Sequence, residues 1–142
     1  MRALGVDYGS KRVGLALSDP TGTIASPLET LVRRAGKRAP IAKLERIARE
    51  RDVEHLVFGL PLDLAGNEPE WCGEVRSVGE RLAERLSVEV SFVDERMTSV
   101  RAERAIRAIG LPKHKREEKG RVDAAAAQLI LQAWLDQRAA ST

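Results

Sequence analysis

The sequence predicts an α/β fold with a mixed five-stranded sheet and helices on both faces of that sheet. Two apolar runs, residues 2–8 and 12–18, are joined by only three residues, which predicts an antiparallel hairpin. Farther along the chain, strand-like and helix-like segments alternate, which is typical of parallel strands joined by crossover helices. The chain has 142 residues, so we expect residues 1–142 to form a single domain.

A turn at residues 19–22 follows the hairpin, and a third strand is expected over residues 24–32. Pro27 interrupts this strand, and because proline cannot donate a hydrogen bond to a neighbouring strand, we expect it at an edge of the sheet. Pro40 suits the start of a helix, and apolar residues at helical spacing extend that helix to about Arg51.

A short buried strand is expected over residues 55–58, followed by a loop rich in Gly and Pro over residues 59–69. Apolar residues then recur at helical spacing from Trp71 to Leu86, which predicts the next helix. Alternating apolar and polar residues predict a strand over residues 87–93.

Two helices complete the prediction, one over about residues 98–110 and one over residues 121–138. Residues 111–120 are expected to form a charged loop between them, and residues 139–142 to fray. The predicted order is β-β-β-α-β-α-β-α-α. Because crossover connections are right-handed, few arrangements remain. A ribonuclease H-like three-layer fold satisfies both this order of elements and the crossover rule. A generic three-layer α/β domain is the alternative.

Composition indicates a globular protein of a reducing compartment. The chain is 43% hydrophobic and 32% charged, and Cys72 is its single cysteine, so no disulfide can form within it. Met1 leads directly into a strand-like run, and no apolar run approaches the roughly 18 residues that span a bilayer. We therefore expect a cytoplasmic protein without membrane association. The net charge of +3 permits a nucleic-acid partner.

Four carboxylates lie where a predicted strand ends or a predicted helix begins: Asp7, Asp94, Glu95 and Asp123. If they converge, they form an oxygen-rich site suited to Mg²⁺ or Mn²⁺. Two such ions about 3.5–4 Å apart can support phosphodiester hydrolysis. Neighbouring residues of a strand face opposite sides of the sheet, so only one of Asp94 and Glu95 can face Asp7. Alternation leaves the choice open, and the longer reach of Glu95 favours it.

Each carboxylate also has a purely structural interpretation. Asp7 suits a turn with Gly9, and Asp94 can pair with Arg96. Asp123, in the first turn of its predicted helix, would favour the helix dipole. The coincidence of three acids at expected sheet edges is what favours a shared site.

Basic residues gather in two runs, and loops in solvent carry such charge routinely. The second run leads directly into Asp123, where it would be placed to hold a phosphate backbone over bound metal ions. No aromatic residue interleaves with either run, so the pattern does not predict base stacking. The two runs are Arg33, Arg34, Lys37 and Arg38, and Lys113, Lys115, Arg116, Lys119 and Arg121.

The motifs closely resemble the YqgF/RuvX family of ribonuclease H-like proteins over nearly the whole chain. The resemblance implies a metal-dependent nuclease, described in that family as processing the 5′ end of pre-16S ribosomal RNA and also as a Holliday junction resolvase. Members are discussed as monomers and as dimers. The motifs that carry the resemblance are DYGSKRVGLALSD (7–19), GLPLDLAGNE (59–68), DERMTS (94–99) and KGRVDAAAAQLILQ (119–132).

By motif match, the resemblance implies Asp7, Glu95 and Asp123 as the acidic triad that holds the metal, and Asp94 would be a fourth ligand. Better characterised junction resolvases, which are distant cousins, place a second acid three residues after the helix aspartate, where this chain has Ala126. The residues expected to contact nucleic acid are Arg12, Arg96, Lys113, Lys115, Arg116, Lys119 and Arg121.

Three hypotheses therefore stand. The first is a Mg²⁺- or Mn²⁺-dependent nuclease acting on structured RNA or branched DNA. The second is an ATP-binding module, because Asp7, Gly9 and Ser10 also resemble the first phosphate motif of actin-like ATPases, although these bind nucleotide between two domains. The third is a non-catalytic nucleic-acid-binding assembly factor, for which the basic loops would suffice.

Overall fold

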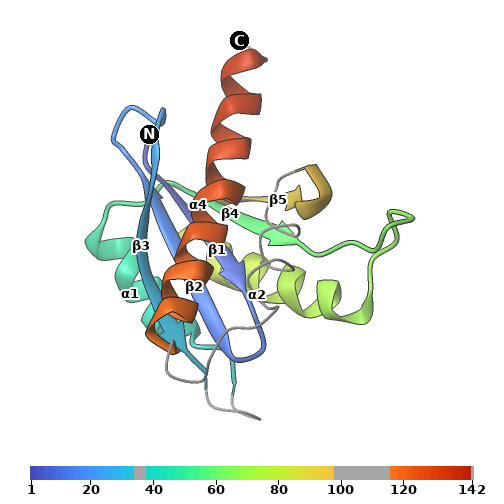
Figure 1. Ribbon diagram of the computed structural model, residues 1–142. Helices are drawn as coiled ribbons and strands as arrows, with labels where there is room; N and C mark the ends of the chain where they lie inside the picture. The colour runs from blue at the N-terminus through green and yellow to red at the C-terminus, as the bar shows by residue number, and fades with distance from the viewer. Residues whose placement is uncertain (34–37, 98–115, 142) are drawn as a thin grey trace.

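The computed structural model describes residues 1–33, 38–97 and 116–141 (Figure 1). The predicted helix over residues 98–110 lies outside these ranges. The described strands are β1 (Ala3–Tyr8), β2 (Arg12–Ser18), β3 (Ala25–Val32), β4 (His55–Leu60) and β5 (Glu89–Asp94). The described helices are α1 (Ile41–Glu50), α2 (Glu70–Leu86), a single 3-10 turn η1 (Glu95–Met97) and α4 (Arg116–Ala140).

The strands form one mixed sheet in the order β3-β2-β1-β4-β5. β1, β2 and β3 are antiparallel, whereas β4 runs parallel to β1, and β5 runs parallel to β4. β3, which contains Pro27, lies at an edge as predicted, because only an edge strand tolerates the missing donor. The carboxyl ends of β1, β4 and β5 therefore point to the same end of the sheet.

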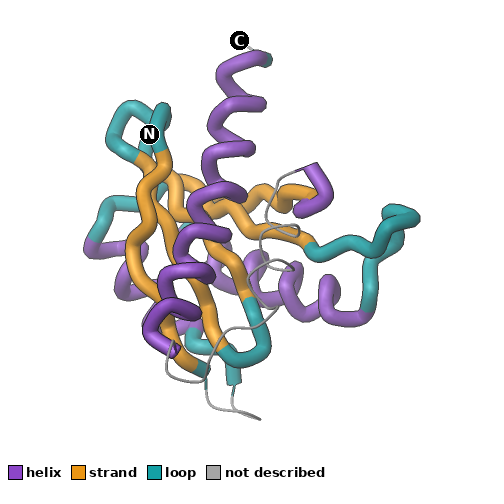
Figure 2. Tube along the Cα trace, viewed as in Figure 1, coloured by secondary structure: helices purple, strands orange, loops and turns teal. Residues whose placement is uncertain are grey.

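Helices cover both faces of the sheet, which confirms the predicted three layers (Figures 1 and 2). α1 and α2 pack on one face over a core that includes Leu4, Leu44, Phe58 and Leu82. α4 crosses the other face over a smaller core. Its far end projects beyond the sheet in Figure 1, where residues 136–141 are exposed.

α4 lies directly on the backbone of the sheet at two glycines. A Cβ atom added to Gly5 would lie 2.7 Å from the Cβ atom of Leu131. A Cβ atom added to Gly14 would lie 2.1 Å from the carbonyl oxygen of Asp123. Neither strand position has room for a side chain, so these two glycines set how closely α4 packs against β1 and β2.

Four predicted boundaries are wrong, the first being the end of β4, which extends to Leu60 and not only to residue 58. α4 begins at Arg116, so residues 116–120 are helical and not part of a charged loop, because Arg, Glu and Lys are good helix formers. α4 continues to Ala140, beyond the expected fraying point. β5 begins at Glu89 because Ser87 adopts a left-handed conformation (φ 56°) that ends α2. Among the helices of the described ranges, none is long and apolar enough to cross a membrane.

Candidate active site

Asp7 lies on the α4 face of the sheet. Along β1, Ala3 packs with α4 and Gly5 lies beneath it, whereas Leu4 and Val6 pack with the α1–α2 layer. Side chains alternate along a strand, so Asp7 shares the face of Ala3 and Gly5. Asp7 is only 7% exposed.

α4 brings Asp123 to the same face. Gly14 of β2 is the cross-strand partner of Asp7, and the backbone of Asp123 packs onto Gly14. The two aspartates, far apart in the sequence, therefore come together over the β1–β2 pair. Asp123 is the eighth residue of α4, counted from Arg116, so the alternative in which it serves a first helical turn is wrong.

Glu95 reaches this face because β5 ends one residue before it. Val93 packs in the α4 core, so Asp94 at the end of β5 falls on the opposite side. At Glu95 the chain enters η1, and its side chain turns over the carboxyl end of β4. Its Oε1 atom lies 2.8 Å from where a Cβ atom on Gly59 would be, so the glycine makes the space that the carboxylate occupies. Glu95 is 3% exposed.

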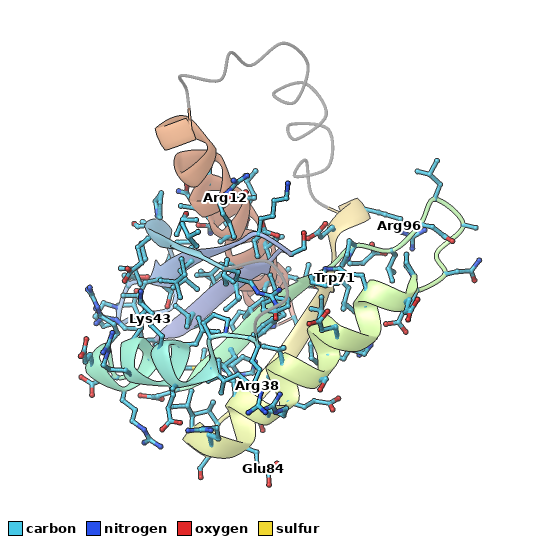
Figure 3. The ribbon with its side chains drawn as sticks, turned by 90° about the horizontal axis from the view of Figure 1, so that it is seen from below. Arg12, Arg38, Lys43, Trp71, Glu84 and Arg96 are labelled. Atoms are coloured by element: carbon cyan, nitrogen blue, oxygen red, sulfur yellow. The ribbon has the colours of Figure 1, made fainter. Side chains whose placement is uncertain are left out.

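The three predicted acids line one cavity of about 360 Å³ together with two cationic side chains. In the view of Figure 3, Arg12 lies beside α4, Arg96 lies beside the loop after β4, and Trp71 lies between them. The cavity is lined by Asp7, Tyr8, Gly9, Ser10, Lys11, Arg12, Pro61, Trp71, Glu95 and Asp123.

Arg12 holds the carboxylate of Asp123. Its Nε atom donates to Oδ2 of Asp123 at 2.5 Å, and the two side chains are 33% and 19% exposed. Within the described residues, no three acidic, His or Cys side chains are close enough to form a ready-made metal cluster. The donors are of the right kind for a hard cation, since they are three carboxylates of which two are buried. Asp123 would have to exchange Arg12 for the ion.

Asp94 is held by Arg96 and does not line the cavity. The backbone N–H of Arg96 donates to Oδ1 of Asp94 at 2.9 Å, and its guanidinium donates to both carboxylate oxygens at 2.7–3.1 Å. Arg96 Nη1 also donates to the carbonyl of Leu64 at 3.4 Å. The hydrogen bonds to the Asp94 carboxylate raise the pKa of Arg96 above its ordinary value. The Asp94–Arg96 pair thus brackets Glu95 and ties η1 to the loop after β4.

Of the other residues expected to contact nucleic acid, Arg12 lines the cavity. Lys113 and Lys115 lie outside the described residues. Arg116, Lys119 and Arg121 occupy the first two turns of α4, at the end of the helix that leads to Asp123.

Sequence reasoning missed Lys11 and Trp71 as cavity residues. Lys11 lies in the short β1–β2 connection, whose approach to α2 and η1 becomes visible only in three dimensions. The spacing of Trp71 predicts a place in the apolar stripe of a helix, but Trp71 lies at the start of α2, where the helix meets the cavity. Arg33, expected in a solvated loop, is instead 8% exposed at its side chain, and its Nη1 donates to the carbonyl of Gly9 at 2.9 Å.

The family model described as "RuvX: Holliday junction resolvase" matches residues 1–137. Relatives of similar length share about two fifths of the sequence. A protein named "Putative pre-16S rRNA nuclease" from Crocosphaera subtropica is 42% identical over 139 residues, covering 98% of this chain and 95% of the relative. A protein of the same name from Anaeromyxobacter dehalogenans is 43% identical over 139 residues, covering 98% and 99%.

Among solved structures, Thermus thermophilus RuvC in complex with a Holliday junction substrate matches with a TM-score of 0.57 at 18% identity, covering 97% of this chain and 95% of that one. A second RuvC structure from the same organism matches with a TM-score of 0.57 at 16% identity, covering 99% and 97%. This likeness confirms the predicted ribonuclease H-like fold. The sequence match is what decides the family: this chain belongs to the RuvX family.

Proposed function

We propose that this protein is a metal-dependent nuclease that hydrolyses phosphodiester bonds in structured nucleic acid, with the 5′ end of pre-16S rRNA as its substrate. The observation that carries the proposal is the cavity, in which carboxylates from β1, η1 and α4 face Lys11 and Arg12. Phosphodiester hydrolysis requires acidic side chains that bind a cation and, beside them, basic side chains that bind the phosphate. The names of the RuvX relatives supply the choice of substrate.

In this proposal Asp7, Glu95 and Asp123 hold Mg²⁺ or Mn²⁺, and two ions fit the number of carboxylates. When bound, the metal supplies an activated water and neutralises charge on the phosphate and the leaving oxygen. The protein contributes rigidity and exclusion of water, because Asp7 and Glu95 are almost fully buried on the end of the sheet.

The chain's cations have two tasks. Lys11 lies in the β1–β2 connection at the cavity and would bind a phosphate oxygen of the substrate. Arg12 holds Asp123 in place. If Asp123 bound the metal, the guanidinium of Arg12 would be available to the same phosphate.

The alternative substrate is a four-way DNA junction, which the family description favours. Ala126 weighs against it. The position at which distant junction resolvases carry a further acid is 4% exposed here and packs against the sheet in the α4 core. A carboxylate ligand has no place there, so the site of this chain is built differently.

The test compares wild type with Asp7→Asn on a pre-16S rRNA 5′ segment, a four-way junction and single-stranded DNA, with and without Mn²⁺. Asp136→Asn is the matched control, because Asp136 is an exposed acid of the same helix as Asp123. We expect Mn²⁺-dependent cleavage of the rRNA segment by wild type and Asp136→Asn, and binding without cleavage by Asp7→Asn. Equal cleavage by all three proteins would indicate a contaminant. Binding without cleavage by all three would support an assembly factor.

A further inference from the structure

Aromatic residues are scarce in this chain, and some of them line the cavity. The chain has five of them: two Trp, one Tyr and two Phe. Phe58 and Phe92 pack against each other in the α1–α2 layer, and Trp134 of α4 stacks on His55 of β4. The other two, Tyr8 and Trp71, line the cavity.

Trp71 is held rigidly in that wall. Its Nε1–H donates to the carbonyl of Tyr8 at 3.3 Å. Its ring stacks on the Tyr8 ring, with centroids 5.6 Å apart and planes 15° apart. The guanidinium of Arg33 lies 4.7 Å from the Tyr8 ring centroid, which supports the stack from within the protein. Trp71 itself is only half-buried, so part of its indole remains accessible from the cavity.

The cavity thus has three walls of different chemistry. Asp7, Glu95 and Asp123 form the acidic wall, Lys11 and Arg12 form the basic wall, and an apolar wall is formed by Tyr8, Pro61 and Trp71. A cation and a phosphate account for the first two walls. Neither accounts for the third, because a site that bound only backbone phosphates would have no use for an aromatic surface.

We propose that Trp71 is the platform of a nucleobase subsite, on which the base of an unpaired nucleotide next to the scissile phosphate stacks. This inference rests on the proposed nuclease function and refines its substrate class. A base inside a duplex already stacks on its neighbours, so the substrate must present a single-stranded or frayed nucleotide at the cleavage point. Aromatic stacking tolerates every base, so the subsite selects for strandedness and not for sequence.

The test uses tryptophan fluorescence, because only Trp71 and Trp134 contribute to it. The Trp134→Phe change leaves Trp71 as the only indole, and Asp7→Asn prevents cleavage. This double variant is titrated with a short oligothymidylate and with an abasic oligonucleotide of the same length. We expect saturable quenching by the oligothymidylate, and binding of the abasic strand that is about 10-fold weaker and without quenching. Equal affinity and equal fluorescence with both strands would overturn the inference.

Substitution of Trp71 separates stacking from folding. In the Asp7→Asn background, we expect Trp71→Phe to retain most of the affinity for oligothymidylate and Trp71→Ala to reduce it about 10-fold, to the level of the abasic strand. If Trp71→Ala lowers the melting temperature but binds both strands as its parent does, Trp71 is only structural. If Trp71→Ala fails to fold, the quenching measurement on the double variant decides alone.

Two further results distinguish this inference from others. Quenching by free ATP but not by oligothymidylate would overturn it in favour of a mononucleotide site. The titration does not depend on cleavage. If wild type showed no Mn²⁺-dependent cleavage while the double variant showed saturable quenching, the proposed nuclease would be contradicted and the nucleobase subsite would remain supported.

Discussion

Arg12 Nε lies 2.5 Å from Oδ2 of Asp123, and this contact joins the β1–β2 hairpin to α4 at the centre of the cavity. Arg12 begins β2, whose neighbour β1 carries Asp7. The hairpin thus supplies both a carboxylate of the proposed metal site and the cation that neutralises another. In the protein without metal, Arg12 offsets the repulsion among three acids held in one cavity.

The first prediction concerns the two consequences of removing this cation. Arg12→Gln should lower the stability of the metal-free protein by about 1 kcal/mol, because a partly buried ion pair is lost. It should also tighten Mn²⁺ binding, because Asp123 is no longer engaged. Differential scanning fluorimetry in EDTA and calorimetric titration with Mn²⁺ measure the two effects. Arg46→Gln, at an exposed position of α1, should change neither. Weaker Mn²⁺ binding by Arg12→Gln would show that Arg12 does not compete with the ion.

The second prediction concerns the pair that brackets Glu95. If Asp94 and Arg96 act by positioning Glu95, Arg96→Ala should lower kcat on the order of 10- to 100-fold with little change in KM, because the carboxylate is misplaced. Asp94→Asn should have a similar effect, and the double variant should be no worse than either alone. Arg96→Lys should rescue little activity, because lysine cannot make the bidentate hydrogen bonds to the Asp94 carboxylate. A raised KM with unchanged kcat would instead make Arg96 a substrate contact.

The third prediction uses the close packing of α4 on the sheet. Gly14→Ala should destabilise the protein by about 1–3 kcal/mol, because the added methyl group overlaps the backbone of Asp123 and must displace α4. Mn²⁺ affinity should fall with it, since α4 carries Asp123. Gly73→Ala is the matched control: an added Cβ there meets nothing within 4 Å, and alanine should stabilise α2 by about 0.5–1 kcal/mol. Chemical denaturation of both variants measures the difference.

The fourth prediction concerns pH. Burial lowers the pKa of His55 from its ordinary value of 6.5, and nearby Arg138 lowers it further, although Glu89 opposes them. The ring also stacks on Trp134, and its Nε2 atom bonds to Ser91. The folded protein thus binds this proton less readily than the unfolded chain does. Stability should therefore fall as the pH drops below about 6.5, until the folded-state pKa is reached.

Melting temperatures measured between about pH 5.5 and 7.5 test this dependence. His55→Gln should remove the part of the slope that His55 contributes. His114→Gln is the control, because His114 is the only other histidine in the chain. If wild type and His55→Gln show the same slope over this interval, the slope arises from other groups.

Much of the sheet could be predicted because its signals are local. The short hairpin connection and Pro27 of the edge strand each act within a few residues, and both were placed correctly. The alternation rule also held, but it could not choose between Asp94 and Glu95, because helices cover both faces of this sheet. The choice depends on where β5 ends and on the space above Gly59, and both are tertiary facts.

The start of α4 and the surroundings of Trp71 could not be predicted for different reasons. Residues 116–120 give two opposing signals. Their charge and Gly120 favour a loop, whereas the propensity of Arg, Glu and Lys favours the helix that the structure has. Trp71 has the spacing of a core residue, and only the position of α2 beside the β1–β2 connection brings it to the cavity.

The bare backbone beneath α4 has a mechanical consequence. Side chains between a helix and a sheet can change rotamer and so accommodate small displacements of the helix. At Gly5 and Gly14 no side chain separates α4 from the sheet. Because Asp123 is part of α4, any translation or rotation of the helix moves this carboxylate by the same amount. A slip of one residue would shift the helix by about 1.5 Å and rotate it by about 100°, carrying the carboxylate away from Asp7 and Glu95.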